Sequence, residues 1–414
     1  MKNNKKYSAE ELMELENRYG AHNYHPLPVV LEKGEGVYLW DVNRKKYYDF
    51  LSAYSAVNQG HCHPKIVETL TEQAQKLTLT SRAFYNDKLG VYEKFVTGYF
   101  GYEKVLPMNS GAEAVETALK LCRKWAYQKK KIAENDAQIV VCAENFHGRT
   151  TTIVSFSVDP DAYTDYGPFT PGFIIIPYND VEALRNVLNE NRNVAGFLVE
   201  PIQGEAGAKV PDDGYLRQTY ELCKENNVLF IADEVQTGIA RTGKLLACDY
   251  EEVKPDILIL GKALSGGVYP VSAVLSNREI MDIILPGQHG STFGGNPLAA
   301  AVAVAALEVV RDERLAEKAY ELGIIFRREM TEFCKTSKVA EFVRGKGLMN
   351  ALIINNADQK NLAWDICLEM AKNGLLAKPT HTNIIRFAPP LVITETQLRE
   401  CIEIIKYSVS KFEK

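Results

Sequence analysis

The sequence predicts an α/β protein: a large domain built on a doubly wound, mostly parallel sheet, and a smaller α+β lobe formed by both ends of the chain. In the middle of the chain, short apolar runs alternate with amphipathic, helix-like stretches such as 180–190 and 214–226. The runs are continuously apolar, as expected for parallel strands covered on both faces. They occupy residues 138–142, 173–177, 195–199, 228–232, 256–260 and 271–275. This rhythm is typical of a doubly wound sheet.

The two ends of the chain have a different pattern. Residues 22–50 contain alternating, strand-like segments, and the last quarter combines long amphipathic helices with short strands such as 350–354. No low-complexity linker separates these parts, so we expect packed junctions between them. The predicted divisions are an N-terminal segment of the small lobe over 1–50, a large domain over 51–311 and a C-terminal small domain over 312–414.

Composition and charge exclude several classes of function. The chain has 414 residues, of which 46% are hydrophobic and 24% charged, and its formal net charge is −5. Apart from a lysine run at 129–131 there is no basic cluster, so nucleic acid is not an expected partner. No apolar run approaches the ~18 residues that span a membrane. Residues 1–20 lack the apolar core of a signal peptide and the Arg-rich pattern of an organelle-targeting segment. We therefore expect a soluble protein of the cytoplasm.

The cysteines give no indication of a metal site. All eight are scattered along the chain, without the paired spacing of metal ligands. This usage fits a reducing compartment, where thiols act as small apolar side chains. His61, Cys62 and His63 resemble metal ligands, but adjacent side chains diverge on a helix or a strand. We expect no metal there.

Two segments of the chain suggest places for a phosphate and for a charged ring. The segment NSGAEA, residues 109–114, opens an amphipathic helix with Ser110 as a candidate N-cap, and free amides at a helix start suit a phosphate. The apolar run VLFIAD ends on Asp233, which needs a partner if buried and could pair with a protonated pyridine nitrogen. Taken alone, the first segment fits an ordinary capped helix better, and the second fits an aspartate that caps the next helix equally well.

Two further segments carry a candidate nucleophile and a candidate carboxylate clamp. Lys262 follows the run DILIL among small residues, and a desolvated lysine readily forms a Schiff base with a carbonyl. Phe146 and Arg149 follow the run IVVCAE, where a ring could stack on a cofactor and a guanidinium could bind a carboxylate. In isolation these are a loop lysine, a core phenylalanine and a surface arginine. All four segments follow predicted strands or open helices, and ligands of α/β sheets bind at such ends.

In this order and context, the four segments resemble the class III aminotransferases, pyridoxal-phosphate enzymes of fold type I. The resemblance covers nearly the whole chain, from about residue 18 to the C-terminal helix. It implies a homodimer with shared active sites, in which Lys262 holds the cofactor covalently and Asp233 pairs with its pyridine nitrogen. The turn at 110–112 would bind the phosphate, with help from the neighbouring subunit. The implied cofactor-binding set is Ser110, Gly111, Ala112, Phe146, His147, Asp233, Gln236, Lys262, Ser291 and Thr292.

Within that class, long stretches such as FLSAYSAVNQGHCHPKI and HGSTFGGNPLA are most similar to the enzymes that transfer the δ-amino group of ornithine to 2-oxoglutarate. The resemblance implies that Arg149 and Tyr24 hold the α-carboxylate and α-ammonium of ornithine, and that Tyr54 lines the pocket. Arg386 would bind 2-oxoglutarate, while Glu205 neutralises Arg386 during the ornithine half-reaction. The products would be glutamate 5-semialdehyde, which cyclises to pyrroline-5-carboxylate, and glutamate.

Other functions stay open at this point. Acetylornithine, 4-aminobutyrate and lysine are alternative amino donors within the class, and an aminomutase or a decarboxylase of the same fold would need no 2-oxoglutarate. His147 departs from the tryptophan that some ornithine enzymes carry, which bears on the substrate but leaves the cofactor chemistry unchanged.

Overall fold

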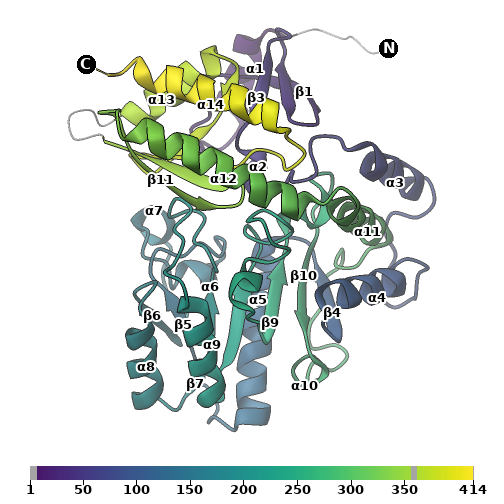
Figure 1. Cartoon of the computed structure of the whole chain (residues 1–414). Helices are drawn as coiled ribbons and strands as arrows, with labels where there is room; N and C mark the ends of the chain where they lie inside the picture. Colours follow the sequence, from purple (N-terminus) through teal and green to yellow (C-terminus); the bar gives the residue numbers. More distant parts are fainter. Residues whose placement is uncertain (1–6, 356–360, 414) are drawn as a thin grey trace.

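The main sheet of the protein has seven strands, in the order β4-β10-β9-β8-β7-β5-β6. The structure is a computed structural model and describes residues 7–355 and 361–413. Neighbouring strands from β6 to β9 pair in parallel, which confirms the expected mostly parallel α/β sheet (Figure 1). The strands are Lys104–Met108 (β4), Gln138–Cys142 (β5), Phe173–Ile176 (β6), Val194–Val199 (β7), Leu229–Asp233 (β8), Ile257–Leu260 (β9) and Ser272–Ser276 (β10).

One of the predicted strands runs in the other direction. β10 is antiparallel to both of its neighbours, β9 and β4, so grouping residues 271–275 with the parallel strands was wrong. A parallel neighbour requires a crossover, usually a helix, that returns the chain to the starting edge of the sheet. The link between β9 and β10 contains only the short 3₁₀ helix Lys262–Ser265, so the chain doubles back. Lys262 lies in that reversal, at the carboxyl edge of the sheet.

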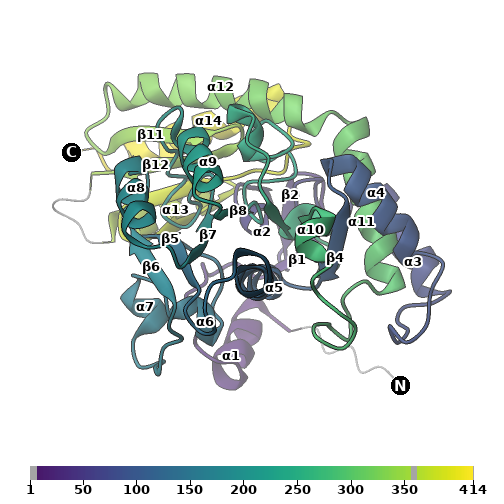
Figure 2. The same ribbon diagram turned by 90° about the horizontal axis from the view of Figure 1, so that it is seen from below.

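Helices cover both faces of the sheet, as the unbroken apolar runs require (Figures 1 and 2). The pleat sends Ile139 to a cluster with α5 and the next residue, Val140, to a cluster with α8 and α9. The helices of this part are Ser52–Ser55 (α2), Pro64–Ala74 (α3), Leu89–Phe100 (α4), Gly111–Trp125 (α5), Thr151–Val154 (α6), Pro160–Tyr163 (α7), Val181–Glu190 (α8), Tyr215–Glu225 (α9), Arg278–Met281 (α10) and Pro297–Asp312 (α11).

The small lobe joins both ends of the chain through two four-stranded sheets, ordered β1-β2-β3-β13 and β11-β12-β15-β14. β13 comes from the C-terminal part and pairs with β3 of the N-terminal part. The strands are Leu31–Glu35 (β1), Tyr38–Asp41 (β2), Lys46–Asp49 (β3), Ala340–Lys346 (β11), Met349–Ile354 (β12), Leu375–Leu376 (β13), Lys378–Thr380 (β14) and Ile384–Phe387 (β15); the helices are Leu315–Cys334 (α12), Leu362–Lys372 (α13) and Glu395–Ser410 (α14). The division at residues 50 and 311 stays a prediction, and residues 1–6, 356–360 and 414 of it lie outside the described residues.

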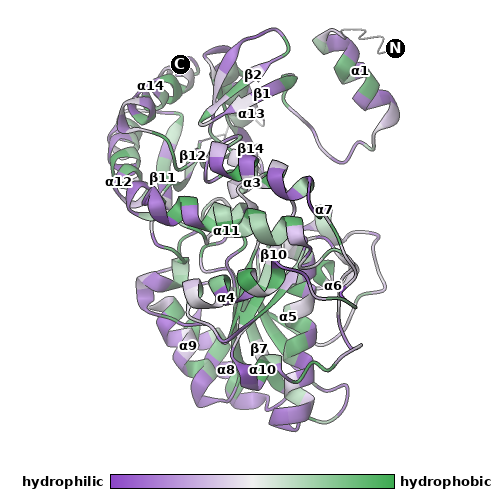
Figure 3. Ribbon diagram, turned by 90° about the vertical axis from the view of Figure 1, so that its right-hand side faces the viewer, coloured by the Kyte–Doolittle hydropathy of each residue, from purple (hydrophilic) through white to green (hydrophobic). Residues whose placement is uncertain are grey.

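The N-terminal helix, Ala9–Tyr19 (α1), stands apart from the rest of the chain in Figure 3. None of its residues is buried, and Tyr19 at its end is 73% exposed. A capping box between Ser8 and Glu11 starts the helix, so local hydrogen bonds rather than packing define it.

Across the described residues, none of the helices has both the length and the apolar character required to cross a lipid bilayer.

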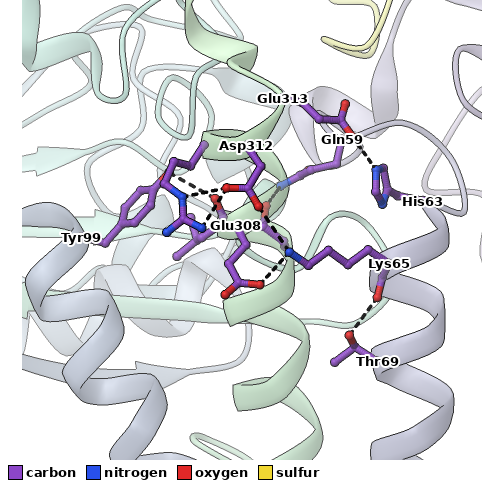
Figure 4. A network of polar contacts seen from close by, with 11 residues as sticks. Gln59, His63, Lys65, Thr69, Tyr99, Glu308, Asp312 and Glu313 are labelled. Carbon is purple, nitrogen blue, oxygen red and sulfur yellow. Dashed lines mark hydrogen bonds and ion pairs between the residues drawn. The ribbon is translucent and has the colours of Figure 1, made fainter.

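The two histidines considered as metal ligands pair with carboxylates of different elements. His61 Nε2 lies 2.7 Å from Asp49, and His63 Nε2 lies 2.8 Å from Glu313. Figure 4 shows His63 beside Lys65, which pairs with Glu308 at 2.8 Å. The contacts of His63 and Lys65 fasten the start of α3 to the end of α11. Within the described residues, no group of three or more His, Cys, Asp or Glu side chains is arranged to hold a metal.

A buried arginine connects the small lobe to the large domain. Arg241 is fully buried and donates hydrogen bonds to Asn58 Oδ1 and to the carbonyls of Leu348 and Pro389, at 3.0 and 2.7 Å. Burial lowers its pKa to about 9, so the guanidinium stays charged at neutral pH. Leu348 precedes β12 and Pro389 follows β15, so this side chain fixes the ends of both strands relative to the large sheet.

Candidate active site

The carboxyl ends of four adjacent parallel strands bring together the residues predicted to hold the cofactor ring, and Glu200 beside them. Asp233 is the last residue of β8, and Lys262 follows β9. Phe146 follows β5, and Glu200 follows β7. Because β9, β8, β7 and β5 are neighbours in the sheet, the groups after them share one edge, which is the usual ligand site of an open α/β sheet.

The start of α5 presents free amides at this edge. Ser110 is the N-cap, and its Oγ accepts from the amide of Glu113 at 3.2 Å, while the Glu113 carboxylate accepts from the amide of Ser110 at 2.9 Å. This confirms the N-cap that the sequence predicts. The first amides of the helix, at Gly111 and Ala112, have no partner within the helix and could bind an anion such as phosphate.

Val235 packs the start of α5 against the end of β8. A Cβ atom at Gly111 would lie 2.9 Å from Val235 Cγ1, so glycine is needed for this close approach. The amide of Val235 donates to Asp233 Oδ1 at 3.0 Å. Val235 therefore holds the helix start, through its side chain, and the carboxylate, through its amide, in a fixed relation.

Lys262 lies in a cavity of about 350 Å³ that is also lined by Ser110 and Gly111. Its backbone has a φ of 44°, a left-handed conformation that is costly for a residue other than glycine. Burial lowers the pKa of the Lys262 amine, and the negative charges of Glu205 and Asp233 oppose this only in part. The position thus makes the amine easier to deprotonate than an exposed lysine, as a nucleophile requires.

Asp233 is held by a histidine. His147 Nδ1 lies 2.7 Å from Asp233 Oδ2, and both side chains are buried. Burial alone would lower the pKa of His147, but the hydrogen bond to Asp233 and its charge outweigh burial and raise the pKa. The imidazole therefore donates a hydrogen bond to one oxygen of the Asp233 carboxylate and fixes its orientation.

A second cavity, of about 490 Å³, is lined by Phe146, His147 and Glu205. Beside it, Arg386 is only 6% exposed, and its Nη1 lies 2.8 Å from Glu205 Oε1 and 3.3 Å from Gln236 Oε1. Burial alone would raise the pKa of Glu205, but the positive charges of Arg386 and Lys262 outweigh burial and lower it. The two predicted partners therefore form an ion pair that closes one side of the site.

The class-III aminotransferase family matches this chain over residues 19–409. The chain belongs to the class-III aminotransferases. It is 63% identical to the mitochondrial ornithine aminotransferase of Drosophila melanogaster, over 95% of this chain and 90% of that protein.

Two solved structures are similar to this aminotransferase over nearly its full length. The ornithine aminotransferase of Toxoplasma gondii, described with pyridoxal phosphate at its active site, has a TM-score of 0.96 and 48% identity, covering 98% of this chain and 94% of that one. A structure described as an acetylornithine aminotransferase, from Elizabethkingia anophelis, has a TM-score of 0.91 and 67% identity, covering 98% of this chain and 99% of that one. The fold type and the cofactor predicted from sequence are thereby confirmed.

The site of this class-III aminotransferase fits pyridoxal phosphate. The phosphate requires free amides, which the start of α5 offers. The aldehyde requires an amine of lowered pKa, such as Lys262, and the ring nitrogen requires a buried carboxylate, such as Asp233. Within the described residues, His147 Nε2 and Arg386 Nε are buried without a hydrogen-bond partner, which leaves polar atoms for bound molecules.

The other predicted residues lie around this centre with less contact. Tyr54 lies in the left-handed turn of α2, 4.9 Å from the Arg386 guanidinium. Tyr24 is 71% exposed. Burial raises the pKa of Tyr54, and Tyr24 is close enough to contribute to that increase. Arg149 is exposed, with its guanidinium 5.6 Å from the ring of Phe146.

The predicted partner-reaching segment lies near the start of α5 of its own chain. Ser291 Oγ accepts from Asn109 Nδ2 at 2.8 Å, and Thr292 is exposed beside it. Its reach into another subunit therefore remains a prediction.

Glu200 is a site residue that the sequence reasoning missed. Its carboxylate is buried and accepts from the amides of Phe146 at 2.8 Å and Gly204 at 3.2 Å. Burial raises its pKa to about 7, with a further contribution from the charge of Asp233. The signal was present, since a carboxylate ends the apolar run VAGFLVE just as Asp233 ends its own strand.

We predict that Glu200→Gln removes a pH dependence of stability. The folded pKa is raised from 4.5 to about 7, so the contribution of Glu200 to stability is complete below about pH 4.5 and is lost as the pH rises through about 7. Glutamine stays neutral. The melting temperature of the variant minus that of the wild type should therefore increase between about pH 5 and about pH 7. Glu182→Gln, at an exposed site, is the control. A difference that is flat with pH would contradict the raised pKa.

Proposed function

We propose that this enzyme transfers the δ-amino group of L-ornithine to 2-oxoglutarate, giving glutamate 5-semialdehyde, which cyclises to pyrroline-5-carboxylate, and glutamate. The observation that carries the proposal is the ion pair between the half-buried Glu205 and the buried Arg386. The similarity to ornithine aminotransferases over nearly the whole chain supports the same substrate.

The ion pair matters because the two substrates present opposite demands. Ornithine brings an amine to the cofactor, with its carboxylate at the far end, and an uncovered Arg386 near the reacting carbon would attract that carboxylate instead. 2-Oxoglutarate has two carboxylates and needs a cation at each end. Glu205 covers Arg386 while ornithine reacts and leaves it when 2-oxoglutarate enters. Specificity then follows from a charge that can be neutralised in place.

The remaining substrate contacts come from the rim of the site. Arg149 binds the α-carboxylate of ornithine in bidentate fashion, and the Tyr24 hydroxyl accepts from the α-ammonium. Tyr54 lines the pocket above Arg386. Binding at this distal end directs the δ-amino group, rather than the α-amino group, to the reacting position.

The chain's own groups position and protonate the reacting centre. Pyridoxal phosphate, when bound, accepts the amino group and stabilises the electron pair left on the substrate carbon. Lys262 Nζ would hold the cofactor before the reaction and, once ornithine has replaced it there, its free amine would accept the proton from the δ-carbon of ornithine. Asp233, oriented by His147, holds the pyridine nitrogen. Phe146 would cover the ring of the cofactor, Gln236 would lie near its hydroxyl, and Ser110, Gly111 and Ala112 would hold its phosphate.

A homodimer with shared active sites is part of the proposal. Exposed apolar side chains lie on two segments, with Phe84 at 69%, Tyr85 at 104% and Phe293 at 46% exposure. Arg82 Nη1 donates to the carbonyl of Gly294 at 3.4 Å, so the two segments are adjacent. An apolar patch of this kind suits a subunit interface. In the dimer, Ser291 and Thr292, which precede Phe293, would reach the phosphate of the cofactor in the neighbouring subunit.

We also propose that the enzyme works in the cytoplasm. All eight cysteines are free thiols, six of them buried, which suits a reducing compartment.

A second candidate function is N-acetylornithine transamination, because the Elizabethkingia anophelis structure described by that activity is 67% identical to this chain. Tyr24 and Glu205 favour the free amino acid, since a tyrosine hydroxyl can accept from an ammonium but gains nothing comparable from an acetamide.

Turnover of ornithine and N-acetylornithine by the purified holoenzyme tests the proposed function. We predict that ornithine alone gives at most one equivalent of pyrroline-5-carboxylate per active site. Further product should form only when 2-oxoglutarate is supplied. The kcat/KM for ornithine should exceed that for N-acetylornithine by at least about tenfold, because the site binds a free ammonium. A preference for N-acetylornithine would instead establish the second candidate. Continued turnover without 2-oxoglutarate would indicate an aminomutase or a decarboxylase.

Replacing Glu205 tests whether this residue acts as a switch, which covers Arg386 while ornithine reacts and leaves it when 2-oxoglutarate enters. In Glu205→Ala, Arg386 stays uncovered, so α-amino donors such as glutamate should gain relative to ornithine, by about tenfold or more in the ratio of kcat/KM values. Rates of the two half-reactions, measured separately with the cofactor spectrum as the signal, give this ratio. An unchanged ratio would rule out Glu205 as the switch.

A further inference from the structure

The loop that carries Glu205 is a short hairpin closed at its base. Gln203 and Lys209 pair across it, with hydrogen bonds of 3.2 and 2.9 Å between their backbones. Within the hairpin, the carbonyl of Gly204 accepts from the amides of Gly207 and Ala208. The tip, residues 205–207, projects toward the small lobe, since its contacts lie there.

The sheet of the small lobe presents a row of side chains to this hairpin. Arg344 of β11 is in register with Ala351 of β12, Ala351 with Arg386 of β15, and Arg386 with Lys378 of β14. Residues in register across a sheet project from the same face. Two arginines therefore flank a small, fully buried alanine, two strands apart, about 10 Å from one another.

The hairpin tip lies between these two arginines. Arg386 Nη1 contacts the Glu205 carboxylate at 2.8 Å and the carbonyl of Gly204 at 3.3 Å. On the other side, Arg344 Nε donates to the carbonyl of Gly207 at 2.8 Å, and its Nη2 donates to the carbonyl of Ala206 at 2.7 Å. The guanidinium of Arg344 thus satisfies the two carbonyls that follow Glu205.

The tip cannot easily adopt another shape while these contacts last. Gly207 has a φ of +86°, and a Cβ atom there would lie 2.7 Å from Ile384 Cγ2 and 3.1 Å from Arg344 Nη2. The tip is therefore packed against β15 and β11 at the same time. Without Arg344, two carbonyls would lose charge-assisted hydrogen bonds, and the tip would be free to leave Arg386.

We propose that Arg344 is a positioning residue that holds the 203–209 hairpin so that Glu205 covers Arg386, and that it thereby helps to set the preference for ornithine over α-amino donors. The inference rests on the proposed function, because it assigns to Arg344 the control of the switch. Arg344 acts through Glu205 rather than on the substrate.

The main test compares Arg344→Met with Glu205→Ala and with the double variant, using the ratio of kcat/KM for glutamate to kcat/KM for ornithine in the holoenzyme. Arg344→Met should raise the ratio, as Glu205→Ala does, by about tenfold. This is the change expected if the free energy that keeps Glu205 on Arg386 falls by about the contribution of one charge-assisted hydrogen bond. In the Glu205→Ala background it should have no further effect. An undiminished effect in that background would show direct action on the substrate and overturn the proposal.

A binding measurement gives a readout that does not depend on turnover. Glutarate, a dicarboxylate without an amine or a keto group, must displace Glu205 to reach Arg386. It should therefore bind Arg344→Met holoenzyme more tightly than wild type, by calorimetry. Hydrogen exchange of the 203–209 amides should also be faster in the variant. Unchanged glutarate affinity together with unchanged exchange would overturn the proposal.

Arg327→Met is the matched control. Arg327 is a half-buried arginine of the same lobe that donates to the carbonyl of Gly347 at 2.8 Å and to Asn350 Oδ1 at 3.0 Å, away from the hairpin. It should leave the ratio and the glutarate affinity as in wild type; equal shifts in both variants would reduce Arg344 to a general stabiliser.

Arg344→Lys keeps the charge but offers no planar pair of donors, so it should give an intermediate ratio, and it serves if the methionine variant does not fold. A wild-type ratio in Arg344→Lys would then contradict the proposal. If Glu205→Ala itself leaves the ratio unchanged, the proposed switch fails; if it changes the ratio and the Arg344 variants do not, only this inference fails.

Discussion

The ion pair between Glu205 and Arg386 is the interaction on which the rest of the site depends. A buried guanidinium is costly without a partner, and here the partner follows a strand of the large sheet, 181 residues away in sequence. The pair therefore requires that the small lobe be held firmly against the large sheet. Arg241 provides this restraint, because it binds the backbone directly before β12 and after β15, the strands that carry the row of Ala351 and Arg386. The strands that Arg241 holds are thus the ones that bring Arg386 to Glu205.

The large sheet supplies the other half of the site by ending four strands at one edge. Asp233 and Glu200 are both carboxylates at the ends of buried strands, yet their surroundings differ. Asp233 accepts a hydrogen bond from the His147 side chain, whereas Glu200 accepts only from backbone amides and has a pKa raised to about 7. The first suits a charged ring nitrogen. The second fixes the backbone at Phe146, which lines the cavity of about 490 Å³, and at Gly204, which precedes Glu205.

Much of this arrangement could be predicted from the sequence, and the reasons are local. Unbroken apolar runs identified six strands, and the residue pattern around Ser110 identified its helix cap, because both depend on neighbours in the chain. The direction of β10 could not be predicted, since it depends on the short reversal at Lys262. The contacts of Arg344 were also out of reach, because its acceptors are backbone carbonyls 137 and 138 residues away. Glu205 and Arg386 were paired only through resemblance to a family, as no spacing rule links them.

A pair of structures of the holoenzyme tests the role of this ion pair most directly: one with ornithine or an unreactive analogue of it in the site, the other with 2-oxoglutarate or glutarate. In the first, a Glu205 oxygen should remain within hydrogen-bond distance of Arg386. In the second, Glu205 should have left and a carboxylate of the ligand should occupy its place on the guanidinium. If Glu205 stays on Arg386 in both complexes, while the dicarboxylate binds through other residues, the ion pair is a fixed structural contact and does not select between the two substrates.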